Sequence, residues 1–334
     1  MRAAAPGKII FSGEHAVVYG KPALVAAVNR FAWAEIDPAD DLSISFHLVD
    51  FNEQASDSFD QLQTVSRNLS QRHQAFLEGK LDISQVVQKP ADLFAFLFIH
   101  FFEQNAVTFD RGLRISLRSD IPVGSGMGSS AATLLAVLRV MTAFYHLEFD
   151  RRKSYDLALT AEKLQHGRPS GVDPYVSLNG GFVCFQDQRA IDLPMPRLPF
   201  YLINTGAPGA STGECVSQVA QRFGASTIWN DFERTTEVLQ HALLQNDSER
   251  VLQAVRDNHR LLIEIGVTPM RVQQFIAELE ARDGAAKIAG AGSIRGDGGG
   301  MVIAFAETPP LDLVEKYGYT LMDVQGEPHG ARLV

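Results

Sequence analysis

The chain has 334 residues, of which 46% are hydrophobic and 21% charged, enough apolar material for a core larger than that of one average domain. Its formal net charge of −9 argues against a protein that holds nucleic acid or an anionic membrane through a general basic surface. The two cysteines, Cys184 and Cys215, are too few for a disulfide-stabilised chain of this length, which favours a reducing cytoplasmic location.

The N-terminal segment does not read as a signal peptide, because Pro6-Gly7-Lys8 interrupts it before any long apolar stretch. The longest apolar run, 93–102, contains His100 and is about half the roughly 20 residues that a membrane helix needs. We therefore expect a soluble protein in which this run is a core helix, with no membrane or nucleic-acid partner.

The first half of the sequence mixes strand-like and helix-like segments. Short runs with β-branched, aromatic or alternating character predict strands at 9–11, 24–36, 42–49 and 113–117. Apolar residues at helical spacing predict helices at 59–78, 91–104, 129–146 and 152–166. The last of these ends at Gly167 with Pro169 just beyond, an arrangement typical of helix ends.

A proline-rich stretch at 192–199 marks the predicted domain boundary, because three prolines exclude a central helix or strand. It divides the chain into an N-terminal α+β domain, 1–190, and a C-terminal α+β domain, 191–334. In the second domain we expect helices at 213–223, 227–245, 248–265 and 269–281 and a final strand at 301–305.

The most informative local motif is PVGSGMGSSAA, 122–132, between a predicted strand and a long buried helix. Glycines let the backbone approach a ligand, and the free amides of a helix start favour an anion, so the motif suits phosphate. The loop lacks the lysine of the GxxxxGK[ST] motif and the spacing of GxGxxG. A glycine-rich turn without a ligand remains a comparable alternative.

A second motif, GRPSGVDPYVSLNGG at 167–181, follows the helix that contains Glu162. Asp173 lies there among small and turn residues, where a carboxylate can face a reacting hydroxyl, although a turn or capping role is the commoner one. Glu162 and His166 are four residues apart and share a helix face. Glu162 and a loop hydroxyl could share a magnesium ion, or Glu162 could be a solvated helix residue.

The N-terminal stretch APGKIIFSGEHAVVYG places Lys8 on or beside a strand and Glu14-His15 in the turn after it. A lysine near a transferred group stabilises developing charge, and polar turn residues can hold a hydroxylated substrate. Surface and capping roles are the alternatives. Near the C-terminus, six glycines between 290 and 300 precede a strand, which suggests either backbone close to a ligand or a flexible loop.

Taken in order from Ala5 to Phe305, these stretches resemble the GHMP family of small-molecule kinases. Within that family, APGK followed by FSGEHAVVYG is similar to the mevalonate kinases, whereas galactokinases follow GEH with Thr-Asp-Tyr. The resemblance implies a two-domain α+β fold with ATP and a small-molecule substrate, mevalonate, in the cleft between the domains. It implies ATP and Mg²⁺ as cofactors, and it leaves open whether the protein is a homodimer.

The resemblance also implies roles for individual residues. Asp173 matches the family's catalytic aspartate, and Lys8 matches the lysine beside the substrate hydroxyl. Ser130 and Glu162 match the metal ligands. Glu14, His15 and Thr212 match positions that line the substrate pocket. The expected nucleotide-binding residues are Pro122, Gly124, Ser125, Gly126, Met127, Gly128, Ser129 and Ser130.

Two features depart from the family pattern. Where many members have GAGGGG, this chain has GAGSIRGDGGG, so 293–297 looks inserted. The stretch NTGAPGASTGECV also resembles phosphomevalonate kinases in its length. The sequence therefore leaves three alternatives to a mevalonate kinase: a phosphomevalonate kinase, a kinase for another small alcohol, and a non-catalytic relative that only binds nucleotide or metabolite.

Overall fold

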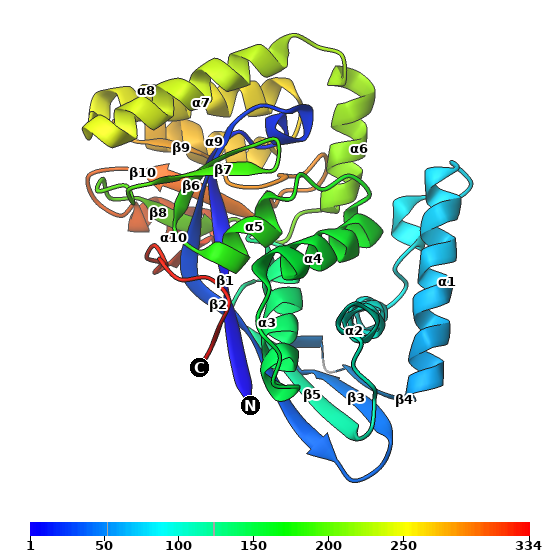
Figure 1. Cartoon of the computed structure of the whole chain (residues 1–334). Helices are drawn as coiled ribbons and strands as arrows, with labels where there is room; N and C mark the ends of the chain where they lie inside the picture. The colour runs from blue at the N-terminus through cyan, green and yellow to red at the C-terminus, as the bar shows by residue number, and fades with distance from the viewer. Residues whose placement is uncertain (52, 123) are drawn as a thin grey trace.

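A computed structural model describes residues 1–51, 53–122 and 124–334 of the chain. It contains two sheets with helices packed on them (Figure 1). The larger sheet has the strand order β12-β1-β2-β5-β3-β4, and β6 and β7 extend it from β2. Its strands are β1 (Arg2–Ser12), β2 (Ala23–Ala39), β3 (Ser43–Leu48), β4 (Glu53–Ser58), β5 (Gly112–Ser119), β6 (Phe182–Gln186), β7 (Arg189–Leu193) and β12 (Arg332–Leu333).

Strand β1 lies between β12 and β2 in the larger sheet, and every residue in it after Arg2 is buried. It pairs with β2 on one side and with the C-terminal β12 on the other, so the two chain termini lie close together (Figure 1). The pairing of β1 with β2 shifts register at Pro6/Gly7 and again near its end. The strand therefore bends as it approaches Lys8, whose side chain is buried.

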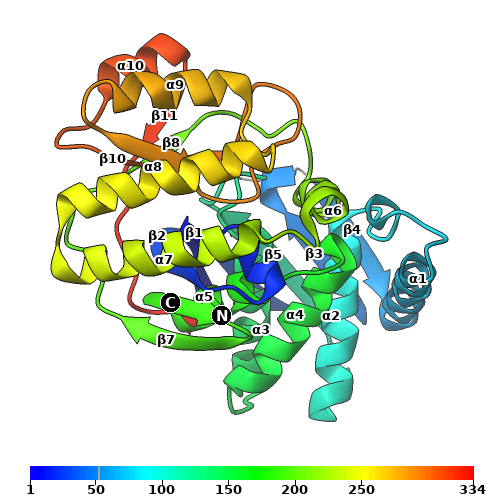
Figure 2. The same cartoon turned by 90° about the horizontal axis from the view of Figure 1, so that it is seen from above.

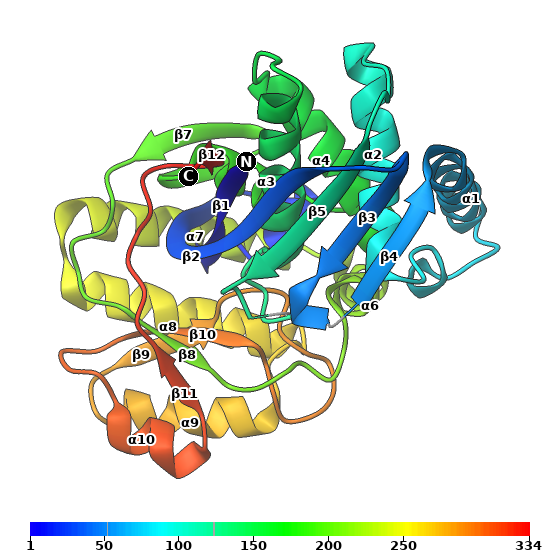
Figure 3. The same ribbon diagram turned by 90° about the horizontal axis from the view of Figure 1, so that it is seen from below.

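Helices cover one face of the larger sheet, as Figure 3 shows from below. They are α1 (Phe59–Leu77), α2 (Pro90–Asn105), α3 (Ser129–Phe144), α4 (Arg151–His166) and α5 (Val172–Asn179). Helix α3 packs on β1 and β2, and it is buried nearly all round because α4 and α5 cover its other sides. This central helix begins at the end of the glycine-rich loop and so fixes where that loop lies.

The smaller sheet has the order β11-β8-β10-β9 and is antiparallel throughout. Its strands are β8 (Tyr201–Asn204), β9 (Ala285–Ile288), β10 (Met301–Phe305) and β11 (Thr320–Met322). The accompanying helices are α6 (Thr212–Phe223), α7 (Ile228–Gln245), α8 (Ser248–Glu264), α9 (Met270–Glu280) and α10 (Leu311–Tyr317). Helices α7 and α8 lie side by side (Figure 2), and α8 and α9 pack against β9, which is buried throughout.

The predicted long helices and the strands predicted at 24–36, 42–49, 113–117 and 301–305 are confirmed to within a few residues, whereas the strand predicted at 9–11 is longer and begins at Arg2. Helix α5, which carries Asp173 in its first turn, was not predicted. Asp192 belongs to β7, an edge strand, which agrees with the expectation that 192–199 contains no central strand. The chain passes between the sheets at 194–200, and β12 returns to the larger sheet, while the division at residue 190 stays a prediction. No helix in the described parts of the chain has the length and apolarity to span a membrane.

Candidate active site

A cavity of about 500 Å³ lies where segments from both halves of the chain meet. Its wall includes β1, the glycine-rich loop, the end of α4 and the start of α5, together with α6 and the loop after β9. Every site residue predicted from the sequence lines it: Lys8, Glu14, His15, Pro122, Gly124, Ser125, Gly126, Met127, Gly128, Ser129, Ser130, Glu162, Asp173 and Thr212. Residues far apart in the sequence thus face one shared space.

The glycine-rich loop is held between the two sheets by backbone hydrogen bonds. The amide of Lys8 in β1 donates to the carbonyl of Met127 at 2.9 Å, and the amide of Met301 in β10 donates to the carbonyl of Ser125 at 3.1 Å. Gly126 lies so close to Gly290 that a Cβ on Gly126 would be 3.2 Å from the Gly290 Cα. Val123, within the same motif, lies outside the described residues.

Gly128 ends the loop and caps α3 with a φ of 72°, a conformation that favours glycine. A Cβ there would lie 3.1 Å from Cγ of Lys8 and 3.5 Å from Oδ2 of Asp173. Three backbone amides follow in the first turn of α3, and a helix start of this kind attracts phosphate oxygens. Gly128 therefore sets the distance between a phosphate-binding helix start and the Lys8–Asp173 pair.

Gly128→Ala tests that spacing, and Gly79→Ala is its matched control. Both glycines have a φ of 72°, so each alanine should cost about 1–2 kcal/mol of unfolding free energy. Gly79 is absent from the cavity wall, and a Cβ on it would meet no described atom within 4 Å beyond its chain neighbours, so only Gly128→Ala should displace Lys8 and lower turnover, by about 10-fold or more. Steady-state kinetics and thermal melts separate the two effects, and equal turnover in both variants contradicts the expectation.

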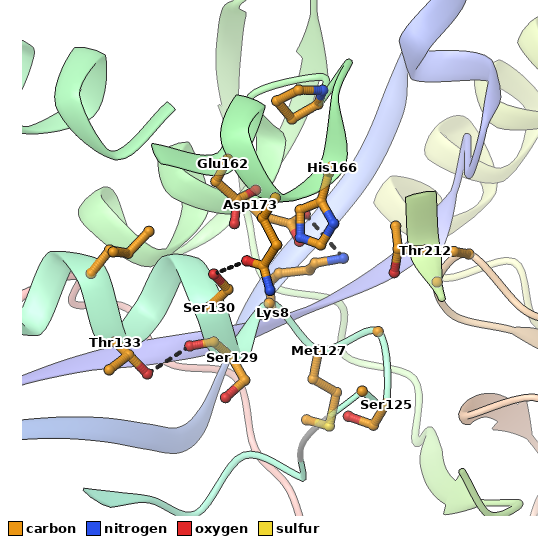
Figure 4. A pocket seen from close by; sticks show the side chains of 18 of the residues that line it. Lys8, Ser125, Met127, Ser129, Ser130, Thr133, Glu162, His166, Asp173 and Thr212 are labelled. Atoms are coloured by element: carbon orange, nitrogen blue, oxygen red, sulfur yellow. Dashed lines mark hydrogen bonds and ion pairs between the residues drawn. The ribbon is translucent and has the colours of Figure 1, made fainter. Parts of the chain in front are cut away.

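Lys8 and Asp173 form an ion pair across the cavity wall, with Nζ 3.1 Å from Oδ1. The Lys8 side chain is 4% exposed and that of Asp173 28% exposed, so the carboxylate is the more accessible partner. Figure 4 shows both side chains converging with Glu162 and His166, while Thr212 faces them from α6. A candidate general base, Asp173, and a cation, Lys8, therefore lie side by side in the cavity wall.

Glu162 is buried beside this pair, near the C-terminal end of α4. Burial, and then the charge of Asp173, raise its pKa to about 8, while Lys8 and Ser130 oppose the rise. The hydroxyl of Ser130 donates to Oε1 of Gln165 at 2.7 Å. Burial also lowers the pKa of His166, which helps keep its imidazole neutral. The site therefore holds a buried carboxyl group with too little positive charge around it, as a cation-binding position would.

The raised pKa of Glu162 makes the stability of the metal-free protein depend on pH. Between the ordinary value of 4.5 and about 8, the folded state keeps a proton that the unfolded state has lost, so unfolding free energy falls as pH rises. Glu162→Gln should remove this part of the slope, because glutamine does not titrate. Urea titrations across that pH range, with the exposed Glu307→Gln as control, measure it. Identical slopes for wild type and Glu162→Gln count against the shift.

Glu14 and His15 follow β1 and are both buried at the cavity wall. His15 shares a hydrogen bond of 3.0 Å between Nε2 and the carbonyl oxygen of Ala291, and burial lowers its pKa. Glu14 forms a buried ion pair with Lys287 of β9. Thr212 is the first residue of α6, beside the N-cap Ser211, whose hydroxyl accepts from the amide of Glu214.

Three residues at or behind the cavity were missed from the sequence. Gln165 binds Ser130, and Lys287 binds Glu14. Arg168 lines the cavity from an exposed position, and no ion pair of its side chain occurs among the described residues. Arg168 belongs to the GRPSGVDP motif at 167–174, and this position could have marked it as a site residue. Nothing in the sequence marked Lys287.

The segment 293–297, which looks inserted, packs against the loop before α6. The Oγ of Ser293 accepts from the amide of Ala210 at 3.2 Å and donates to the carbonyl of Arg295 at 2.6 Å. Arg295 forms an ion pair with Glu214 at 2.7 Å. The segment is therefore tied to the start of α6, which carries Thr212.

Comparisons with known proteins identify relatives of this chain. The GHMP kinases N terminal domain matches residues 91–181. "Mevalonate kinase" of Archaeoglobus fulgidus is 31% identical and covers 90% of this chain and 91% of the relative. The protein of the same name from Thermococcus gammatolerans is 32% identical, and the alignment covers 91% of this chain and 88% of the relative. The crystal structure of Methanococcus jannaschii mevalonate kinase has the same fold, with a TM-score of 0.80 at 20% identity over 98% of each chain.

Proposed function

This chain belongs to the GHMP kinase family, and from that membership we propose that it transfers the γ-phosphate of ATP to the primary hydroxyl of mevalonate, giving 5-phosphomevalonate. The names of its relatives support the substrate. The observation that carries the chemistry is the meeting of Lys8, Asp173 and Glu162 beside the glycine-rich loop in one cavity. A binding protein without catalysis has no need of a base beside a buried lysine.

In this proposal, the chain mainly positions the reactants and neutralises charge, since phosphoryl transfer leaves little covalent work to the protein. The loop and the first turn of α3 hold the phosphates through backbone amides. Asp173 accepts the proton of the substrate hydroxyl. Lys8 stabilises the charge that develops on the oxygens around the transferred group. Arg168 offers a cation for the substrate carboxylate.

Glu162 near the end of α4 and Ser130 in the first turn of α3 fit a magnesium ion, because the buried carboxyl group of Glu162 lies beside the Ser130 hydroxyl. Glu162 and Ser130 would hold it, and the ion would supply charge neutralisation on the phosphates. No group of three or more His, Cys, Asp or Glu placed to bind a metal occurs among the described residues. The remaining ligands would therefore be phosphate oxygens and water.

A panel of alcohols incubated with ATP and magnesium tests the assignment. Mevalonate should be the best substrate, with phosphomevalonate and homoserine as comparators and ADP release without alcohol as the background. Faster turnover of either comparator would replace mevalonate as the substrate. Nucleotide binding without any turnover would favour the non-catalytic alternative.

A further inference from the structure

A buried ion pair joins the two halves of the molecule behind the cavity. Lys287 lies in β9 of the smaller sheet, and Glu14 follows β1 of the larger one. The two residues are 273 positions apart in the sequence, and their side chains are 0% and 1% exposed. Because both charges are out of water, each depends on the other for its stability.

The ammonium group of Lys287 has a full set of acceptors. Besides Glu14 Oε1, its Nζ donates to the carbonyl of Ile10 at 3.3 Å and to that of Ile288 at 2.7 Å. A lysine has three N–H donors, so all three are used. Lys287 is therefore fixed in place and has no donor left for a ligand.

Glu14 differs, because only one of its carboxylate oxygens is satisfied. Oε2 is buried and has no hydrogen-bond partner among the described residues, although Glu14 lines the cavity. A buried acceptor left unpaired is costly and uncommon in folded proteins. The arrangement suits a carboxylate that holds one oxygen in the protein and keeps the other for a donor that enters the cavity.

The charged and titratable groups around the pair do not compete for Glu14. Lys8 is engaged with Asp173. His15 contacts the Ala291 carbonyl, and burial lowers its pKa. Burial, and then the charge of Lys287, lower the pKa of His259 on α8 to about 4, so its imidazole is neutral near pH 7. Lys287 is thus the cation that fixes the orientation of the Glu14 carboxylate.

We propose that Lys287 is a positioning residue, which clamps Oε1 of Glu14 so that Oε2 accepts a hydrogen bond from a hydroxyl group of the substrate. This inference rests on the proposed function, since it names the part of the alcohol-binding site that Glu14 provides. Lys287 acts through Glu14 and does not touch the substrate. The clamp also ties the substrate end of the cavity to both sheets.

A four-protein cycle tests the proposal: wild type, Glu14→Gln, Lys287→Met and the double variant, measured with the best alcohol of the panel. Glu14→Gln should raise KM for the alcohol by about 10-fold or more, because a hydrogen bond to a charged group is lost. Lys287→Met should do the same, with KM for ATP nearly unchanged. In the Glu14→Gln background, adding Lys287→Met should change KM for the alcohol by less than about 2-fold.

The pH dependence gives a readout that a merely structural lysine would not move. Without Lys287, burial of Glu14 is unopposed by its main partner, so the carboxyl group holds its proton to higher pH than in wild type. KM for the alcohol in Lys287→Met should therefore fall as pH rises, over a range above that of wild type. The double variant should lack this dependence, because glutamine does not titrate.

Lys316→Met, which removes an exposed lysine paired with Glu278, is the matched control and should match wild type in KM. If either single variant does not fold, the double variant, which buries no lone charge, is compared with wild type, and an unchanged KM for the alcohol overturns the proposal. Additive effects of the two changes, or an unchanged KM in Glu14→Gln, overturn the proposal. Failure of wild type to phosphorylate any alcohol overturns the proposed function instead.

Discussion

Asp173→Asn should lower turnover by at least about 100-fold, which is the lower range for general-base assistance. Asparagine keeps the size of the side chain and its place in the first turn of α5, but it cannot take the proton of the substrate hydroxyl. Because that interaction is made mainly in the transition state, KM for the alcohol and for ATP should change much less than kcat. Steady-state kinetics with both substrates measure the split.

The alternative role for Asp173 is structural, since aspartate in the first turn of a helix also stabilises that helix. Asp312→Asn is the matched control, because Asp312 lies in the first turn of α10 and pairs with Arg282. It should leave kcat near that of wild type. Melting temperatures on the same preparations show whether each variant is folded, and a folded Asp173→Asn protein with near-normal turnover refutes the base assignment.

Hydrophobic patterning was sufficient to predict the elements that are covered by other elements on all sides. Helix α3 was predicted from the run 129–146, because a segment of that length that is apolar nearly all round suits a buried helix. The shorter strands were missed for a physical reason. Strands β8 and β9 have four residues each, so the pattern contains too few positions to reveal a period, and their pairing is decided by distant partners.

Helix α5, which carries Asp173, was not predicted from the sequence. Pro174 and the nearby glycines are typical of turns, yet proline is tolerated in the first turn of a helix, where its missing N–H would have no intrahelical acceptor. Gly171 caps the helix with a φ of 87°. The same residues that predict a turn therefore also start a short helix, and packing on α3 and β1 decides between the two.

The site could be predicted from the sequence only in part. The motifs and their resemblance to GHMP kinases pointed to Lys8, Glu162 and Asp173, and the structure brings these side chains together. The partner of Glu14 could not be predicted, because Lys287 lies in a short buried strand where an apolar residue is expected. Pairings between residues so distant in the sequence follow from how the two sheets meet, which no local pattern encodes.

Lys8→Met should lower turnover by about 100- to 1,000-fold, comparable to the loss of one preorganised group that stabilises transition-state charge. Methionine preserves most of the buried stem of Lys8 but removes the ammonium group that pairs with Asp173 at 3.1 Å. Two effects then add, since developing charge is no longer neutralised and the Asp173 carboxylate loses the group that orients it. Steady-state kinetics should show the loss mainly in kcat.

A matched control is Lys21→Met, which removes a partly buried lysine that is paired with Glu233 at 2.7 Å and absent from the cavity wall. It should retain turnover, because its ion pair lies away from the reacting groups. Circular dichroism and thermal melts on both variants separate loss of folding from loss of chemistry. If folded Lys8→Met turns over the alcohol within about 3-fold of wild type, Lys8 does not stabilise the transition state, since even one lost catalytic hydrogen-bond donor costs far more.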